Sequence, residues 1–239
     1  MGEAQCGTSN KSSKIMSDAR AEIFASIRHA LGVTGKEAPR RSIIEDRLDH
    51  APKGVVPARG QGDPPTRKEI FKTQALRAQA SLAEVASLDA VPAEVAAYLR
   101  DNNLAARIRG GADPRLATMT WAETEFVLEL AKDGSDLTSI GIAFGGIAET
   151  GTLAFVSGTD NPTHLNFLPD HHIAVLQASD IVSDYERLLR KLRMVYGKGL
   201  MPRVLNFVTG PSRSADIAHT LLLGAHGPRR LHIIVVNDV

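Results

Sequence analysis

The chain has 239 residues, 43% of them hydrophobic, and its 28 Lys and Arg residues nearly balance its 27 Asp and Glu residues, for a formal net charge of +1. This composition predicts one globular domain with extra segments, and it disfavours proteins that bind nucleic acids or membrane surfaces through a basic face. Cys6 is the single cysteine, so no intrachain disulfide and no cysteine-based zinc or iron–sulfur site can form. The N-terminus lacks the apolar core of a secretory signal, and no apolar run reaches the roughly 20 residues of a membrane span, so we expect a cytoplasmic location.

The N-terminal arm is expected to comprise residues 1–66, with the globular domain at 67–239. The first 16 residues are polar and predict a disordered tail. A helix should begin around Ser17 and end at Gly32, because apolar residues recur at helical spacing between them. Prolines, glycines and charges dominate residues 33–66, which predicts a linker. The apolar stripe of the helix comprises Ile23, Phe24, Ile27, Ala30 and Leu31.

The globular part alternates helical and strand patterns. Short apolar, β-branched strands mixed with helices predict an α/β fold with a largely parallel sheet flanked by helices. A capping box of Ser183 and Glu186 should open the long helix that Gly197 ends. Helices are expected at 66–80, 91–104, 183–197 and 214–224, and strands at 105–111, 139–145, 152–158, 172–178, 203–210 and 231–239.

The glycine-rich turn "GGIAETGT" is the first candidate site. Its successive backbone N–H groups could form an anion-binding concavity, and Glu149 could serve as a nucleophile or general base if burial raises its pKa. A tight β-connection, whose polar side chains satisfy local backbone donors, is an equally good interpretation. The pattern has neither the lysine of a Walker loop nor the GxGxxG of a dinucleotide fingerprint. The ligand-binding candidates in this turn are Gly145, Gly146, Thr150, Gly151 and Thr152.

The second candidate site is "TGPSRSADI". A strand should end at Gly210 and a helix begin near Ser212 to Ser214, where free N–H groups and the Arg213 guanidinium could hold a carboxylate or phosphate. Ordinary helix capping by Ser212 or Ser214, or pairing of Arg213 with Asp216, would be the simpler explanation.

Histidines mark two further segments. His226 lies between glycines in "GAHGPRRL", where it could titrate near neutral pH or be an exposed loop residue beside Arg229 and Arg230. In "THLNFLPDHHIAV", His171 and His172 are adjacent at a strand start and should point to opposite faces. We therefore expect no metal site from this run.

Together these segments resemble the LUD domain, or lactate-utilisation, family. "GGIAETGTL" is similar to the central motif of the family, "LPDHHIAVL" to the segment that follows it, and "GPSRSADI" and "LGAHGPRRLHIIVV" to its C-terminal signature. The opening helix "ARAEIFASIRHALG" resembles the start of the lactate utilization protein C group. Asp170 stands where the family usually has a second proline. The resemblance covers most of the chain apart from residues 33–66.

The resemblance implies a NagB/RpiA/CoA-transferase-like α/β fold and a role in oxidising lactate to pyruvate within a three-component system. The other components carry iron–sulfur cysteine motifs that this chain lacks, so clusters are expected in partner subunits and no cofactor in this chain. Related CoA-transferases use a glutamate nucleophile, which is why Glu149 is the candidate catalytic residue.

Three functional hypotheses follow. The leading one is a cluster-free accessory subunit that binds a small carboxylate or phosphate between the Gly145–Thr152 and Gly210–Ser214 turns, with His226 nearby. The second is a Glu149-dependent transferase or isomerase acting on a CoA-linked or phosphorylated acid. The third is a scaffold whose N-terminal helix and arm dock iron–sulfur partner subunits.

Overall fold

The computed structural model describes residues 9–121, 124, 126–130, 137–217 and 220–237, and the side chains among them except those of 9–18 and 215–222. Cys6 and the rest of the first eight residues lie outside this range. The chain divides into two units, Met1–Pro52 and Lys53–Val239. The second unit thus begins before the boundary near Arg67 that composition suggested, because the segment after Pro52 packs on the globular domain.

The first unit contains two helices, α1 (Ser9–Leu31) and α2 (Ala38–His50). The prediction of a helix start near Ser17 was wrong, since α1 begins at Ser9, but Gly32 ends it as expected, with a φ of 61°. The apolar residues of α1 from Ile23 to Leu31 are exposed within this unit. The linker prediction for 33–66 missed α2, because Pro39 occupies the first turn of that helix, where a proline needs no N–H partner.

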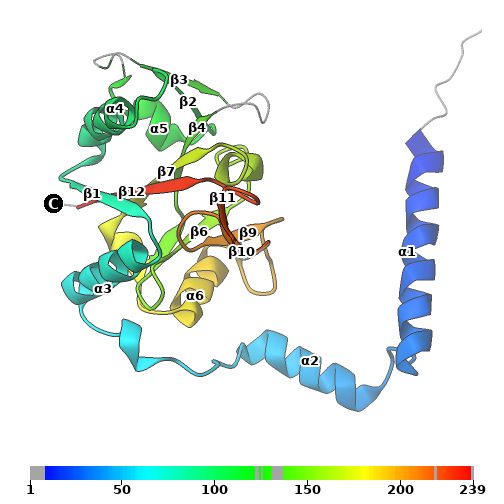
Figure 1. Cartoon of the computed structure of the whole chain (residues 1–239). Helices are drawn as coiled ribbons and strands as arrows, with labels where there is room; N and C mark the ends of the chain where they lie inside the picture. The colour runs from blue at the N-terminus through cyan, green and yellow to red at the C-terminus, as the bar shows by residue number, and fades with distance from the viewer. Residues whose placement is uncertain (1–8, 122–123, 125, 131–136, 218–219, 238–239) are drawn as a thin grey trace, which may run out of the picture. The chain divides into compact units, whose positions relative to one another are not determined.

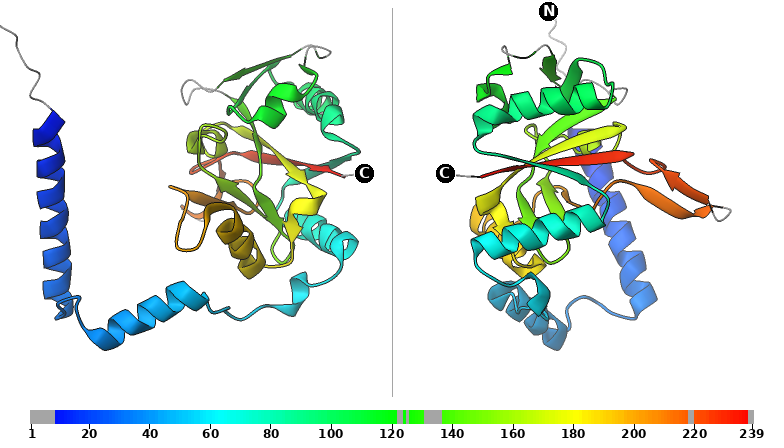
Figure 2. Two further views of the ribbon diagram at one scale, coloured as in Figure 1. Left: turned by 180° about the vertical axis from the view of Figure 1, so that it is seen from behind. Right: turned by 60° about the vertical axis from the view of Figure 1, so that its left-hand side comes forward.

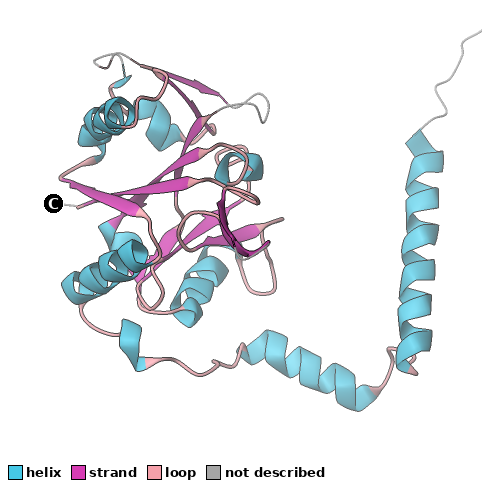
Figure 3. Cartoon of the chain, viewed as in Figure 1, coloured by secondary structure: helices cyan, strands magenta, loops and turns pink. Residues whose placement is uncertain are grey.

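The second unit is an α/β domain built on a six-stranded parallel sheet (Figures 1 and 3). Its strand order is β1-β12-β7-β4-β2-β3, and every adjacent pair is parallel. The largely parallel sheet flanked by helices is therefore confirmed. The strands are β1 (Ser81–Val85), β2 (Arg107–Gly110), β3 (Val127–Leu130), β4 (Thr138–Ile142), β7 (His171–Gln177) and β12 (Arg230–Val236).

A second, four-stranded sheet has the order β8-β5-β6-β9 and is mixed. The predicted strand at 139–145 is in fact split: β4 ends at Ile142 and β5 starts at Gly145, so the chain passes from the parallel sheet to the second sheet between them. The strands of the second sheet are β5 (Gly145–Ile147), β6 (Thr152–Val156), β8 (Ile181–Val182) and β9 (Leu205–Val208).

The predicted helix at 214–224 is wrong. The structure forms an antiparallel hairpin there, β10 (Arg213–Ile217) and β11 (Thr220–Leu223), which extends from the domain in the right-hand view of Figure 2. Backbone pairing of Arg213 with Leu223 and of Ser214 with Leu222 overrides the helical spacing of the apolar residues. The side chain of Asp216 lies outside the described part, so its pairing with Arg213 stays a prediction.

Helices and short 3-10 turns complete the second unit. The long helix α6 opens on Asp184, whose carboxylate accepts from the Arg187 N–H at 2.9 Å, so the predicted Ser183 cap was displaced by one residue. Gly197 ends it at a φ of 95°, as expected. The helices are α3 (Pro64–Arg77), α4 (Val91–Asp101), α5 (Pro114–Thr118) and α6 (Tyr185–Tyr196), and the 3-10 turns are η1 (Ala58–Gly60), η2 (Leu88–Ala90), η4 (Thr163–Asn166) and η5 (Ala178–Asp180).

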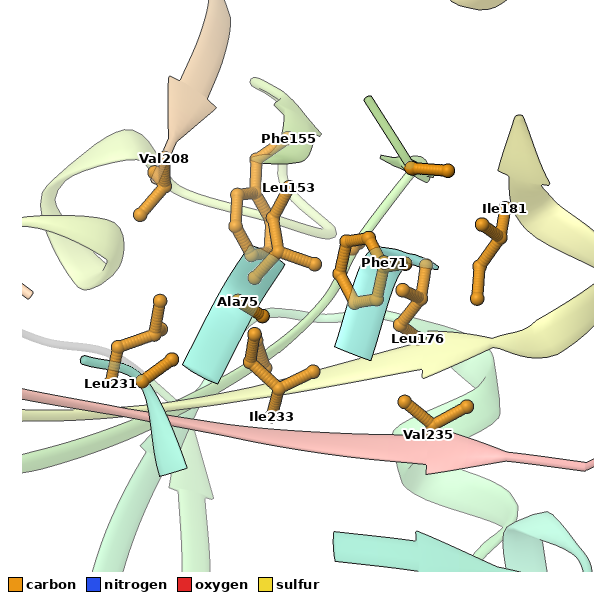
Figure 4. Close-up of a cluster of buried hydrophobic side chains, with 14 residues drawn as sticks. Phe71, Ala75, Leu153, Phe155, Leu176, Ile181, Val208, Leu231, Ile233 and Val235 are labelled. Carbon is orange, nitrogen blue, oxygen red and sulfur yellow. The ribbon is translucent and has the colours of Figure 1, made fainter. Parts of the chain in front are cut away.

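Helix α3 fills the space between the two sheets. Phe71 and Ala75 of α3 are fully buried and lie over Ile233 and Leu176 of the parallel sheet, with Phe155 of β6 beside them (Figure 4). The opposite face of the parallel sheet packs on α4 and α5 through a separate apolar cluster. This arrangement brings the C-terminal end of α3 to both candidate turns. Among the described helices, none combines the length and the apolar character needed to cross a bilayer.

Candidate functional site

The Glu149 turn joins β5 to β6 and is filled by protein. The backbone N–H groups of Ala148, Glu149, Thr150 and Gly151 all donate to carbonyl oxygens of residues 147, 182 or 183, at 2.8–3.4 Å. The anion-binding concavity predicted for this turn is therefore not formed, because its donors are already used.

The glycines of this turn serve close packing. A Cβ on Gly145 would lie 2.8 Å from Leu188, and one on Gly146 would lie 2.7 Å from Leu176. Gly151 has a φ of 66°, and a Cβ there would lie 2.4 Å from the Ala75 backbone nitrogen of α3. These three glycines therefore pack against helices and core side chains and do not form the wall of a ligand site that the sequence predicted.

The Glu149 carboxylate is closed off by a strap, which we define as residues 53–63. Arg59 of the strap donates from Nη2 to Glu149 Oε1 at 2.6 Å, and Glu149 is only 7% exposed. Gly60 lets the strap approach, since a Cβ there would lie 2.1 Å from the Ser183 carbonyl oxygen. The strap is further held by Gln61, whose amide donates to Asp184 Oδ2 at 3.0 Å. Sequence reasoning missed Arg59, because it lies in a segment whose composition predicted a linker.

Hydroxyl groups form a hydrogen-bonded cluster around Thr152, at the start of β6. Thr152 Oγ1 is 2.7 Å from both Thr150 Oγ1 and Thr209 Oγ1, and 3.2 Å from the Tyr185 hydroxyl. Thr152 is fully buried, so it reaches a ligand only if the surrounding chain moves. Thr209 connects this cluster to the second candidate turn, which starts at the next residue.

The second candidate turn packs against the C-terminal end of α3. Gly210 has a φ of 72°, and a Cβ there would lie 2.1 Å from the Ala78 carbonyl oxygen. Arg213 is exposed and donates from Nη2 to the same oxygen at 3.3 Å. Because Arg213 opens a strand, the anion site expected at a helix N-terminus is wrong.

The predicted neighbours of this turn do come together. Ser212 Oγ accepts from the His226 backbone N–H at 3.3 Å, and the Ser212 N–H donates to the Pro228 carbonyl at 2.8 Å. The His226 loop and the Ser212 turn are thus one assembly. His226 itself is exposed.

An open polar cavity of about 620 Å³ lies beside this assembly, and we call it the arginine hollow. It lies at the amino ends of β1, β7 and β12, whereas ligand sites of open parallel sheets usually lie at the carboxyl ends. The turn after Gly210 and the hairpin that follows it complete the wall of this cavity, through Pro211, Arg213 and Leu223. The lining residues are Gln79, Ser81, Asp170, His171, Pro211, Arg213, Leu223, Arg229, Arg230 and Leu231.

The charge of the arginine hollow is predominantly positive. Arg229 Nε lies 3.3 Å from Asp170 Oδ1, which offsets one of its three guanidinium groups. His171 Nδ1 is 3.0 Å from the Tyr98 hydroxyl, and burial together with the nearby Arg230 charge lowers the pKa of His171. Two cationic guanidinium groups and a neutral imidazole thus face one cavity, which suits a carboxylate or phosphate.

The Glu149 turn and the arginine hollow do not share one described cavity wall. The cavity beside Arg59, of about 550 Å³, is lined by Arg59 and by α3 residues, whereas the hollow is lined by the residues named above. Both turns nevertheless contact the last turns of α3, Gly151 at Ala75 and Gly210 at Ala78. His171 and His172 point to opposite faces as expected, since His171 reaches the hollow and His172 is fully buried among residues of the other face.

The fold defines a class of α/β proteins with a six-stranded parallel sheet, a second mixed sheet and a polar cavity at the strand starts. A crystal structure of a DUF162 family protein from Deinococcus radiodurans has this fold: it matches with a TM-score of 0.55 at 22% identity, covering 74% of this chain and 99% of that chain. The LUD domain model matches residues 73–236, and the chain belongs to the LUD domain family.

Relatives with curated names point to one group within this family. The chain is 36% identical over 106 residues to lactate utilization protein C of Shouchella clausii, covering 44% of this chain and 46% of that protein. It is 36% identical over 121 residues to the protein of that name from Halalkalibacterium halodurans, covering 49% and 52%. It is 38% identical over 109 residues to lactate utilization protein C of Geobacillus kaustophilus, covering 44% of this chain and 45% of that protein. The aligned part of the chain spans about half the length of the curated relatives it matches.

Proposed function

We propose that this protein is a cluster-free accessory component of a lactate-to-pyruvate oxidation system and that it binds a small carboxylate or phosphate in the arginine hollow. The membership of the LUD domain family and the names of the relatives support the role in lactate utilisation. The observation that carries the ligand proposal is the convergence of Arg213, Arg229 and Arg230 on one open cavity.

The chemistry of the hollow favours binding over catalysis. Guanidinium groups hold carboxylate or phosphate oxygens through paired N–H donors and cannot lose their proton near neutral pH. Ser212 and His226 belong to the assembly beside the hollow, and Ser214 follows Arg213 in β10. Electron transfer would belong to partner subunits that carry iron–sulfur clusters, because the single Cys6 cannot ligate a cluster alone.

The test is a reconstituted lactate-oxidation assay with purified cluster-bearing partners, with and without this chain. The proposal predicts that the chain raises the rate and that Arg213→Gln loses most of that increase. Arg203→Gln is the matched control, because Arg203 is exposed and lies outside the lining of the hollow. Equal rates with and without the chain would remove the accessory role.

A Glu149-dependent transferase or isomerase is the second candidate. The burial of the Glu149 carboxylate favours it, together with the hydroxyl cluster that begins at the next residue, Thr150. Reaction at Glu149 would require the strap to leave, since Arg59 occupies the carboxylate. A covalent acyl intermediate trapped on Glu149 from a CoA-linked acid would support this function, and full activity of Glu149→Gln in the reconstituted assay would exclude it.

The scaffold hypothesis concerns the first unit. The exposed apolar residues of α1 and α2 favour docking of a partner subunit. Deletion of residues 1–52 should then abolish co-purification with the cluster-bearing partners while Lys53–Val239 keeps its fold. Unchanged co-purification would count against a docking role.

A further inference from the structure

Two serine–histidine pairs bridge neighbouring strands of the parallel sheet at matched register. Ser139 of β4 pairs with His172 of β7, and Ser81 of β1 pairs with His232 of β12. In each pair the serine Oγ lies close to the histidine Nδ1, at 2.9 Å and 2.8 Å respectively. The two histidines contact different surroundings, Phe155 for His172 and Tyr98 for His232.

The protons of the Ser139 pair can be assigned from its contacts. Ser139 Oγ lies 2.7 Å from the Leu165 carbonyl oxygen, and a contact that short between two oxygens needs the hydroxyl proton between them. That proton is the only one Ser139 has. The contact of 2.9 Å with His172 must therefore be donated by the His172 Nδ1–H, which leaves Nε2 as an acceptor.

This acceptor has no protein partner. His172 is fully buried, and among the described residues Nε2 has no hydrogen-bond donor. Burial lowers the pKa of His172 to about 4, so the ring is neutral near pH 7 and Nε2 keeps its lone pair. A buried acceptor without a donor costs free energy, and native proteins commonly satisfy such groups with internal water.

Two asparagines in the segment that covers β4 also have buried polar atoms without hydrogen-bond partners. Asn161 donates from Nδ2 to the Val156 carbonyl oxygen at 3.3 Å, but its Oδ1 is buried without a donor in the described structure. Asn166 is fully buried, and neither its Oδ1 nor its Nδ2 has a described partner. It follows Leu165, the residue whose carbonyl holds Ser139. The group therefore contains more acceptors than donors.

Gly141 marks the place where the His172 and Asn161 side chains converge. A Cβ on Gly141 would lie 3.1 Å from Asn161 Oδ1, 3.5 Å from His172 Cε1 and 3.7 Å from Phe155 Cε1. Since Cε1 is bonded to Nε2, one small molecule beside Gly141 can reach both the histidine and the asparagine. A methyl group on Gly141 would lie closer to Asn161 Oδ1 than an ordinary van der Waals contact.

We propose that a buried water molecule binds beside Gly141 and donates its hydrogens to His172 Nε2 and Asn161 Oδ1. The excess of acceptors selects a neutral donor and disfavours a carboxylate or phosphate, whose oxygens would face other acceptors. This site presents hydrogen-bond acceptors, whereas the arginine hollow presents cationic donors. Its existence does not depend on the proposed function.

The second serine–histidine pair offers a built-in control. His232 Nε2 lies 3.5 Å from the Glu94 carboxylate, and the Ser81 hydroxyl is 3.4 Å from the Leu231 carbonyl, too far to fix its proton there. Ser81 is therefore free to donate to His232 Nδ1, which places the ring proton on Nε2, a buried nitrogen 3.5 Å from Glu94 that makes no hydrogen bond among the described residues. The two histidines should be opposite tautomers.

The first test is the histidine ring ¹⁵N spectrum of the full-length wild-type protein near pH 7. We expect His172 to carry its proton on Nδ1, with an Nε2 shift typical of a hydrogen-bonded acceptor, and His232 to carry its proton on Nε2. A proton on His172 Nε2 would overturn the proposal. Because this measurement uses the unaltered chain, it does not depend on whether a variant folds.

The second test counts long-lived internal waters by magnetic relaxation dispersion. Gly141→Ala places a methyl group against the proposed site, 3.1 Å from Asn161 Oδ1 and 3.5 Å from His172 Cε1, so the dispersion amplitude should fall by the equivalent of one water. Gly158→Ala in the same covering segment is the control, since its Cβ would meet only one atom, 3.8 Å away, and should leave the amplitude unchanged. An equal amplitude in the wild type and a folded Gly141→Ala protein would refute the water site.

Discussion

The Glu149 turn and the arginine hollow lie at the same end of α3 but differ in what satisfies their polar groups. In the turn, every backbone donor from Ala148 to Gly151 and the carboxylate itself contact protein atoms, and the strap covers them. In the hollow, Arg213 and Arg230 face a cavity of about 620 Å³. Glycine and charge in a loop therefore do not by themselves identify a binding site, because the same residue types can be used up by packing.

The closed turn should be sensitive to any added atom. Gly151→Ala puts a Cβ 2.4 Å from the Ala75 nitrogen at a φ of 66°, so the backbone of α3 or of the turn must move. We expect the free energy of unfolding to fall by at least about 3 kcal/mol, measured by urea denaturation. Gly199→Ala is the control, with a φ of 76° and no atom within 4 Å, and should cost only about 1 kcal/mol. Equal losses for both variants would show that the turn is not tightly packed.

The buried His172 should make the stability of the fold depend on pH, unlike His171, which faces the hollow. Burial lowers the pKa of His172 to about 4 from 6.5, so the folded state binds fewer protons than the unfolded state between these values. Stability is then fully present above about pH 6.5 and falls as the pH drops toward 4, by as much as about 1.4 kcal/mol per unit where the two states differ by one proton. His232 follows the same direction. His172→Gln should flatten this part of the pH profile, and an unchanged slope would contradict the assignment.

The strap should depend on its ion pair with Glu149. Arg59→Gln leaves a carboxylate that is 7% exposed without its cation, and we expect a loss of about 1–2 kcal/mol in unfolding free energy. Combining it with Glu149→Gln should recover part of that loss, since no buried charge remains. Protease susceptibility of residues 53–63 should rise in Arg59→Gln. If the single and double variants are equally stable, the pair does not hold the strap.

The smallest effect concerns His171, which lines the hollow. An anion bound there stabilises the imidazolium form, so saturating lactate or inorganic phosphate should raise the pKa of His171 by about 0.5 to 1 unit. The measurement is an NMR titration of the histidine ring signals with and without the anion. His172, buried on the other face, serves as the internal reference, and a parallel shift of both rings would indicate an indirect effect.

Much of the parallel sheet was predictable because its strands are short apolar runs. The patterns at β4, β7 and β12 report their burial directly, as does that of β6 in the second sheet. The hairpin of β10 and β11 was not predictable, since its apolar residues also fit a helix and the choice depends on cross-strand pairing.

The candidate site was only partly visible in the sequence for a similar reason. The turns at Glu149 and Arg213 were found as local patterns, and the contact of Ser212 with His226 matches the expected proximity. Arg59, which neutralises Glu149, is distant in sequence and carries no motif, so only the folded chain reveals it. Arg229 and Arg230 looked like solvated loop charges because their convergence with Arg213 depends on two segments that only the fold brings together.

Anion binding in the arginine hollow can be measured by isothermal titration of lactate, pyruvate and inorganic phosphate into the full-length protein. We expect at least one of these anions to bind, Arg213→Gln to weaken its affinity by at least about tenfold, and Arg203→Gln to leave it unchanged. Binding that is equally strong in the wild type and in Arg213→Gln, or no binding of any of the three anions, would contradict the proposed anion site.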